Sequence, residues 1–246
     1  MPTDPASPAL PDPRPTRDKD AVLVQRMFDR VAPRYDIANA ILSFGSDQHW
    51  RRVAVRALAP AADEHILDVA TGTGRLAREI QQAGAATVAL DFSWNMLATG
   101  AAAERSSALP RLQWLNGDGT ALPFADDSFD AVTISFGLRN IPDARAALAE
   151  FARVTRPGGR LVVMEFSTPT NRALRRVYED YLVGALPRVA DLVTSDPAAY
   201  TYLAQSILAW PDQAGLAAWI AQAGWIGPRW QNLSGGIVAL HHAVHP

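Results

Sequence analysis

The sequence of 246 residues contains no cysteine, which excludes disulfide bonds, iron–sulfur ligation, thiolate zinc sites and cysteine nucleophiles. It has little net charge, because 23 basic and 25 acidic residues give −2, so a basic face that binds nucleic acid is not expected. No apolar run approaches the ~20 residues of a membrane-spanning helix, and the N-terminus lacks the pattern of a secretion signal. We expect a cytoplasmic protein that contacts the inner face of the membrane at most transiently. The oligomeric state is not indicated.

The apolar fraction of 48% is typical of a globular domain. Six prolines in residues 1–20 predict a disordered leader, followed by one domain over 21–246. Within that domain the pattern predicts a helical lid over 21–60, a cofactor-binding core over 61–169 and a substrate-side insertion over 170–210. A final helix and a strand hairpin occupy 211–246.

Strands alternate with helices from His65 onward, which indicates an α/β fold with a parallel sheet covered by helices on both faces. The expected helices include one over 142–155, opened by Pro142 at its first turn and ended before the glycines at 158 and 159. Two late strands, around the turn at 234–236, should form an antiparallel hairpin at the sheet edge. The five earlier strands are expected over 65–70, 87–91, 112–115, 130–136 and 160–165.

A glycine-rich loop, Thr71-Gly-Thr-Gly74, joins the first of these strands to a helix, and Asp91 ends the next strand. Glycines let the backbone approach a ligand and expose helix N-terminal amides to it, while a carboxylate at that strand end takes the hydroxyls of a ribose. The run from Gly72 to Ala77 also fits the dinucleotide fingerprint. The loop therefore predicts an adenosine cofactor and leaves NAD open.

Two further carboxylates distinguish between these cofactors. Asp68 precedes the glycines, where it would repel a pyrophosphate but suits the ammonium and sulfonium of S-adenosylmethionine; alternatively it only hydrogen-bonds the amides of the loop. Asp118 can accept the adenine amine while Gly119 donates its amide to the ring, although the same residues would suit a plain polar turn. Together these positions favour S-adenosylmethionine, bound by Asp68, Gly72, Asp91, Asp118 and Gly119.

The sequence resembles the C-methyltransferases of menaquinone and ubiquinone biosynthesis from about residue 22 to the C-terminus. General class I methyltransferase motifs are present at 68–74, 91–97, 122–124 and 156–159. More diagnostic stretches are Phe28-Asp-Arg-Val-Ala-Pro-Arg-Tyr-Asp36, Ile134-Ser-Phe-Gly-Leu-Arg-Asn140, Leu186-Pro-Arg188, Tyr200-Thr-Tyr-Leu-Ala-Gln-Ser-Ile207 and Pro211-Asp-Gln213.

The resemblance implies a Rossmann-like class I methyltransferase with a mostly parallel seven-stranded sheet. It also implies C-methylation of a polyprenyl quinol with S-adenosylmethionine, with conversion of demethylmenaquinol to menaquinol favoured over methylation of a methoxybenzoquinol. It adds Thr73 and Ser135 to the cofactor contacts. Two departures stand in the glycine loop: Ala70 replaces a glycine of general methyltransferases, and Thr71 replaces another.

Methylation of a quinol carbon requires removal of a phenolic proton, and an arginine can stabilise the resulting charge. Arg139 is the catalytic candidate, with a structural arginine bonded to loop carbonyls as the alternative. Substrate contacts are assigned to Tyr35, Asn39, Asn140 and Tyr200, although Asn39 could simply cap a helix. No metal is expected, because adjacent histidines on the last strand face opposite ways, and His49 is a weaker candidate base.

Two other functions stay open: an NAD-dependent oxidoreductase and a noncatalytic protein that binds the adenosyl cofactor. A polyprenyl substrate would also need an apolar mouth between the lid and the insertion. Five apolar residues could form an exposed patch there or belong to the core. They are Phe44, Trp50, Leu182, Leu186 and Leu203.

Overall fold

The computed structural model describes residues 45–104, 112–185 and 197–246, and the side chains of 185 and 197–200 are excluded from that description. The predicted leader, the first part of the lid, and Tyr35, Asn39, Phe44 and Leu186 lie outside the described residues. Within the described part, no helix is both long enough and apolar enough to cross a membrane.

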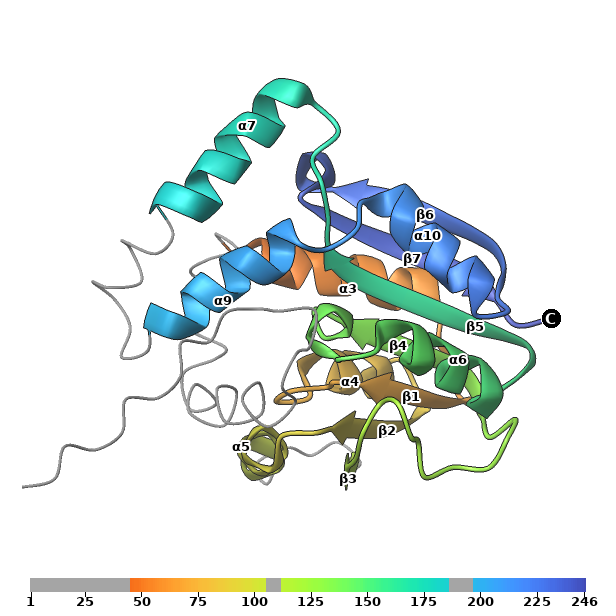
Figure 1. Ribbon diagram of the computed structural model, residues 1–246. Coiled ribbons are helices and arrows are strands. Elements are labelled where there is room, and N and C mark those ends of the chain that lie inside the picture. The colour runs from red at the N-terminus through yellow and green to blue at the C-terminus, as the bar shows by residue number, and fades with distance from the viewer. Residues whose placement is uncertain (1–44, 105–111, 186–196) are drawn as a thin grey trace, which may run out of the picture.

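Seven strands form one sheet in the order β3-β2-β1-β4-β5-β7-β6, and only β7 runs antiparallel to its neighbours on both sides (Figure 1). The central strands are mostly buried and mostly apolar, as expected for a sheet covered on both faces. The order reverses between β1 and β4, where ligands bind in open α/β sheets. The strands are β1 (His65–Val69), β2 (Ala86–Asp91), β3 (Gln113–Asn116), β4 (Phe129–Ser135), β5 (Thr155–Phe166), β6 (Ile226–Leu233) and β7 (Val238–Val244).

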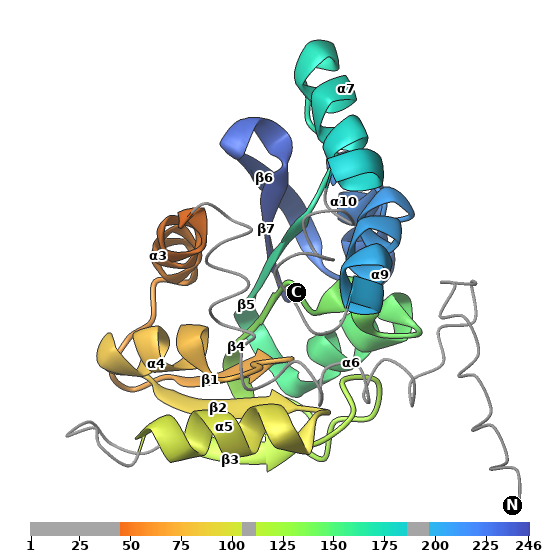
Figure 2. The ribbon, with the colours of Figure 1, turned by 90° about the vertical axis from the view of Figure 1, so that its left-hand side faces the viewer.

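Helices cover both faces of this sheet (Figure 2). One face carries α3 (Ser46–Leu58) and α4 (Arg75–Gln82); the other carries α6 (Ala144–Val154) and α10 (Gln213–Gln222), and α5 (Trp94–Glu104) packs along β2 and β3. Two apolar clusters fill the layers. One centres on the fully buried Phe151 of α6, and the other lies between Trp50 of α3 and the sheet. The predicted mostly parallel, seven-stranded fold with an edge hairpin is confirmed.

Two boundaries were predicted wrongly. The helix expected over 142–155 is α6, which begins at Ala144 behind an Asp143 cap whose side chain accepts from the amides of Arg145 and Ala146. Pro142 therefore precedes the cap rather than opening the helix. The strand β5 starts at once at Thr155 and includes the two glycines, because a bulge in its pairing with β4 absorbs the extra residues.

The described part of the segment predicted as the insertion contains α7 (Arg172–Asp180), a π-helical turn (Tyr181–Ala185) and α9 (Pro197–Leu208). Its own apolar cluster includes Leu182 and Ala204. Leu182 is 2% exposed and Trp50 is 5% exposed, so for these two residues the structure favours the alternative that they belong to the core. Leu203 is half-buried against the same cluster.

Candidate functional site

The glycine loop leaves the carboxyl end of β1 and enters α4 through two left-handed residues, Gly72 with φ +58° and Gly74 with φ +76°. A Cβ on Gly74 would lie 2.4 Å from the Trp114 ring, so only glycine fits there. A Cβ on Gly72 would meet nothing within 4 Å. The loop is therefore fixed at Gly74 and open at Gly72, where a ligand can approach the backbone.

Asp68 stands on β1 just before this loop and is 1% exposed. Its Oδ2 accepts a hydrogen bond of 2.6 Å from the hydroxyl of Thr71, so the residue that replaces a glycine holds the carboxylate in place. Burial raises the pKa of Asp68 to about 7, and the nearby Asp91 carboxylate adds to this shift. A cation at this point would pair with a buried and otherwise costly negative charge.

Asp91 ends β2 beside the loop. Its Oδ2 accepts the Gly72 amide at 2.7 Å and its Oδ1 accepts the Ser93 amide at 2.8 Å. Asp91, which is predicted to bind the ribose, therefore also stabilises the backbone of the glycine loop.

The segment predicted to hold adenine follows β3. The exposed carboxylate of Asp118 accepts the Thr120 amide at 2.8 Å, which closes a local turn. Gly119 is buried, and a Cβ there would lie 3.1 Å from Ile141 and 3.3 Å from Val69. This close packing brings the turn next to the carboxyl end of β1. It also explains why position 119 is a glycine.

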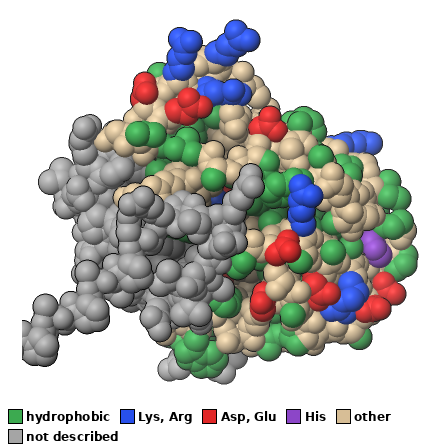
Figure 3. Space-filling view, in the orientation of Figure 1, with side chains coloured by type: hydrophobic (Ala, Val, Ile, Leu, Met, Phe, Trp, Pro, Cys, Tyr) green, Lys and Arg blue, Asp and Glu red, His purple; other side chains and the backbone are tan. Residues whose placement is uncertain are grey.

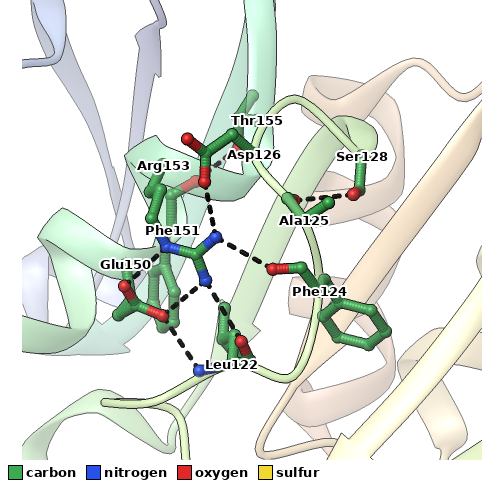
Figure 4. Close-up of polar contacts among 9 residues, drawn as sticks. All are labelled: Leu122, Phe124, Ala125, Asp126, Ser128, Glu150, Phe151, Arg153 and Thr155. Carbon is green, nitrogen blue, oxygen red and sulfur yellow. Dashed lines mark hydrogen bonds and ion pairs between the residues drawn. The ribbon is translucent and has the colours of Figure 1, made fainter.

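A single arginine braces the chain that continues from this turn (Figure 4). Arg153 of α6 donates to the carbonyl oxygens of Leu122 and Phe124, at 3.1 and 2.9 Å, and to the carboxylates of Glu150 and Asp126. Glu150 in turn accepts the Leu122 amide at 2.9 Å. The 122–126 segment is thus hydrogen-bonded to α6 through one backbone amide and through two backbone carbonyls.

The remaining predicted cofactor residues are Thr73 and Ser135. Thr73 is buried in the glycine loop, and its carbonyl accepts from Arg78 at 2.7 Å. Within the described residues, the buried Oγ of Ser135 at the end of β4 has no hydrogen-bond partner. An open glycine backbone, a buried carboxylate and a buried hydroxyl without a partner fit a cofactor with a cationic end and several polar groups.

Arg139, the catalytic candidate, lies in a 3-10 turn, Leu138–Asn140, and is 4% exposed. Its NH1 donates to Glu165 Oε1 at 2.8 Å and to the Phe136 carbonyl at 2.6 Å, and its Nε donates to Ser206 Oγ at 3.4 Å. Its own amide donates to the other oxygen of Glu165 at 3.3 Å. The arginine therefore also has the structural role that the sequence left open as an alternative.

The insertion contacts this turn directly. Tyr202 of α9 donates from its hydroxyl to Asn140 Oδ1 at 3.2 Å, which links two of the diagnostic stretches. Burial raises the pKa of Tyr202 and of Tyr178 in α7, so both phenols are protonated near neutral pH. Tyr200 lies on α9, but its side chain is outside the description, and Tyr35 and Asn39 are not described at all.

The histidines do not gather at this edge of the sheet. His49 is exposed on α3, and the buried His241 has its Nε2 2.9 Å from the Gln213 carbonyl oxygen. Among the residues described, no group of three or more histidines, aspartates or glutamates is arranged to hold a metal ion.

Comparison with known proteins agrees with this geometry. The family model of ubiE/COQ5 methyltransferases matches residues 16–245. The chain belongs to this family. It is 57% identical to the demethylmenaquinone methyltransferase of Mycolicibacterium paratuberculosis over 93% of this chain and 96% of that protein. The enzyme of the same name from Mycobacterium tuberculosis strain H37Ra is 55% identical over 95% of this chain and 97% of its own length.

Solved structures share the fold at much lower sequence identity. A methyltransferase of Thermotoga maritima aligns with a TM-score of 0.64 at 18% identity, covering 90% of this chain and 99% of its own. The Haemonchus contortus phosphoethanolamine N-methyltransferase 2 aligns with a TM-score of 0.61 at 14% identity, covering 80% of this chain and 52% of its own. These likenesses support the class I methyltransferase fold.

Sequence reasoning missed Glu165, the buried partner of Arg139. The signal was present, because Glu165 is the only charged residue in the apolar run Leu161-Val-Val-Met-Glu-Phe166. A carboxylate in the middle of a buried strand needs a cation or several donors close by. Reading that need together with Arg139 would have predicted the pair.

Proposed function

We propose that this chain, a methyltransferase of the ubiE/COQ5 family that uses S-adenosylmethionine, methylates the ring carbon of demethylmenaquinol. The observation that carries the proposal is the pair of carboxylates, Asp68 and Asp91, on either side of the open Gly72 backbone at the switch point of the sheet. The two mycobacterial relatives supply the substrate class, since both are demethylmenaquinone methyltransferases.

The cofactor end of the site is assigned residue by residue. Asp68 pairs with the ammonium group of the methionine portion, and Gly72 and Thr73 present the loop backbone to it. Asp91, at the end of β2 beside the loop, takes the ribose hydroxyls. The adenine lies at Asp118 and Gly119, and Ser135 offers its hydroxyl from the end of β4.

Bound S-adenosylmethionine supplies a methyl group activated by a sulfonium centre. With the cofactor bound, a phenolic proton of the quinol would pass to water, the ring carbon would take the methyl group with release of S-adenosylhomocysteine, and the ring proton would be lost as the phenolic oxygen is protonated again. Arg139 stabilises the negative charge that develops on the phenolic oxygen, because it is a buried cation beside the end of β4. Asn140, Tyr35, Asn39 and Tyr200 orient the quinol.

A polyprenyl quinol reaches the protein from a bilayer, and α7 is the surface proposed to meet that bilayer. Three arginines, Arg172, Arg175 and Arg176, lie in its first five residues, where the helix dipole disfavours cations (Figure 3). Val177, next to Arg176, and Val183, in the π-helical turn that follows α7, are 66% and 67% exposed. Exposed valines next to arginines suit reversible contact with anionic lipid.

A methyl-transfer assay tests the reaction. Purified full-length protein is incubated with methyl-labelled cofactor and either reduced demethylmenaquinone, a reduced methoxybenzoquinone or no quinol. We expect label in the menaquinone product with the first substrate. Transfer to the benzoquinol alone would reassign the substrate, and binding of NAD but not S-adenosylmethionine in a parallel calorimetric titration would overturn the proposal.

Arg139→Lys tests the proposed catalytic role in the same assay. It keeps a buried positive charge but loses the forked geometry, so kcat should fall while the Kd for S-adenosylmethionine stays within about twofold. A wild-type kcat would leave Arg139 with a structural role only.

Flotation with liposomes containing anionic lipid tests the membrane contact. Replacing Arg172 and Arg176 with glutamine should reduce the bound fraction, whereas Arg229→Gln removes an equally exposed arginine from β6 and serves as the control. Equal flotation of both variants and the wild type would refute the role of α7.

A further inference from the structure

Phe136, the residue directly after β4, has an unusual backbone. Its φ is +56°, in the left-handed region that a bulky side chain rarely adopts. Strain of this kind persists only where the surroundings hold the residue in place, and it concentrates at functional sites. The neighbouring Gly137 cannot be replaced easily either, since a Cβ there would lie 2.4 Å from the Cβ of Ala70 on the adjacent glycine loop.

Three hydrogen bonds of the Phe136 backbone hold this conformation, and an ion pair fixes one of the donors. The Phe136 carbonyl accepts from Arg139 NH1 at 2.6 Å and from Asn140 Nδ2 at 3.3 Å, and its amide donates to the Met164 carbonyl at 2.8 Å. Arg139 is itself fixed to Glu165 of β5. The two residues predicted to act on the substrate thus also determine the backbone geometry of Phe136.

The strained backbone places the Phe136 ring in a row of aromatic side chains. Its centroid lies 5.8 Å from that of Trp50 and 5.0 Å from that of Phe166, and both pairs are tilted. Trp50 is buried and anchored by a 3.1 Å hydrogen bond to Ser234, and Phe166 lies with its ring 5.0 Å from the Arg139 guanidinium. Phe136 and Phe166 are only half-buried.

The row stands where the methyl acceptor has to bind. Phe136 lies between Ser135, assigned to the cofactor, and Arg139 and Asn140, assigned to the quinol. Phe166 packs both against the cluster under α3 and against the cluster of the insertion, so it joins the two regions expected to enclose substrate. Aromatic rings next to a buried cation match a substrate that is an aromatic ring bearing a developing phenolate.

We propose that Phe136 is a positioning and specificity residue: its ring, directed by the Arg139 and Asn140 contacts to its carbonyl, forms with Phe166 the surface on which the quinol ring packs. The inference rests on the proposed function and extends it. A bicyclic naphthoquinol covers more of such a surface than a single ring does, so the pair favours naphthoquinols over benzoquinols.

Steady-state kinetics with tail-less naphthoquinol and benzoquinol substrates test this role in the full-length protein. Phe136→Leu should raise KM for the naphthoquinol about fivefold, with a smaller rise for the benzoquinol, while the Kd for S-adenosylmethionine stays within about twofold. Phe136→Tyr keeps the ring and should restore the wild-type KM. Trp219→Leu shortens another half-buried aromatic side chain, which lies on α10 and packs on Trp210, and is the control.

The outcomes separate the inference from the proposed function. A wild-type protein that methylates neither quinol defeats both, whereas an active wild type with unchanged KM values in Phe136→Leu defeats only the inference. If Phe136→Leu does not fold, Phe166→Leu replaces it with the same expectations. Loss of activity in Phe136→Tyr as severe as in Phe136→Leu would also overturn the role of the ring.

Discussion

The two halves of the candidate site are held together in different ways. In the half that faces the cofactor, Asp68 accepts from Thr71, and Asp91 accepts from Gly72 and Ser93; these donors are 3, 19 and 2 residues away along the chain. In the half assigned to the quinol, Arg139 contacts Glu165 and Ser206, which are 26 and 67 residues away, and Asn140 contacts Tyr202 across 62 residues. The first half is a local structure, while the second is assembled from strands and the insertion.

This difference has a physical consequence for how each half responds to mutation. Local contacts form wherever the strand–loop–helix unit forms, so their loss weakens ligand binding more than it changes the fold. Long-range buried contacts join separate elements, so their loss leaves buried polar groups without partners and destabilises the whole domain. The predictions below test this contrast.

The largest effect is expected for the buried pair of the quinol half. Glu165→Ala leaves the Arg139 guanidinium buried without its carboxylate and should lower the free energy of unfolding by roughly 3–5 kcal/mol, measured by urea denaturation. The double variant with Arg139→Leu removes both charges and should recover part of the loss. Equal stability of Glu165→Ala and the wild type would show that the Arg139–Glu165 pair does not stabilise the contact between β5 and the turn Leu138–Asn140.

A pH-dependent effect of a few kcal/mol is expected for Asp68. Because burial raises its folded-state pKa to about 7, the folded protein binds this proton more tightly than the unfolded chain does. Its contribution to stability is complete below pH ~4 and is lost as the pH rises toward and through 7. Urea denaturation between pH 5 and 8 should show this loss in the wild type and a flatter profile in Asp68→Asn.

The affinity for S-adenosylmethionine should depend on the same proton, but it should rise with pH where the stability falls. Protonated Asp68 cannot pair with an ammonium group, so wild-type affinity should fall as the pH drops below about 7. Asp68→Asn should bind weakly at every pH in that range. A calorimetric titration that finds the same pH dependence in both proteins would assign the proton to another group.

Asp91→Ala is expected to weaken cofactor binding more than it lowers stability. Losing charge-assisted hydrogen bonds to the ribose should weaken S-adenosylmethionine binding by about 10–100-fold, measured by calorimetry. Stability should fall by only about 1–2 kcal/mol, because the amides of Gly72 and Ser93 lose their acceptor. Asp91→Asn keeps an acceptor and is the control for that second effect; unchanged affinity in Asp91→Ala would mean that the loop does not bind the cofactor.

The same contrast explains how much could be predicted from the sequence. Asp68, Gly72 and Asp91 stand at fixed distances along the chain around one strand–loop–helix unit, so their spacing predicted their neighbourhood, and strand alternation predicted the sheet. Glu165 and the role of Tyr202 depend on which strands become neighbours and where the insertion folds back. The start of β5 was missed for a related reason, since its glycines indicate a turn locally but occupy a bulge when paired with β4.

The smallest effect is expected at Arg153, which contacts Glu150 in its own helix and also the distant segment 122–126. Arg153→Lys keeps the charge near Glu150 but cannot reproduce the fork that also reaches the carbonyls of Leu122 and Phe124, so it should cost roughly 1–2 kcal/mol. Because Asp118 and Gly119 precede the braced segment, the Kd for S-adenosylmethionine should rise by about two- to threefold. Arg156→Lys changes another exposed arginine, which pairs with Asp130 outside this segment, and should leave that Kd unchanged. Equal effects of the two substitutions would mean that the brace supports the fold but does not position the adenine-binding turn.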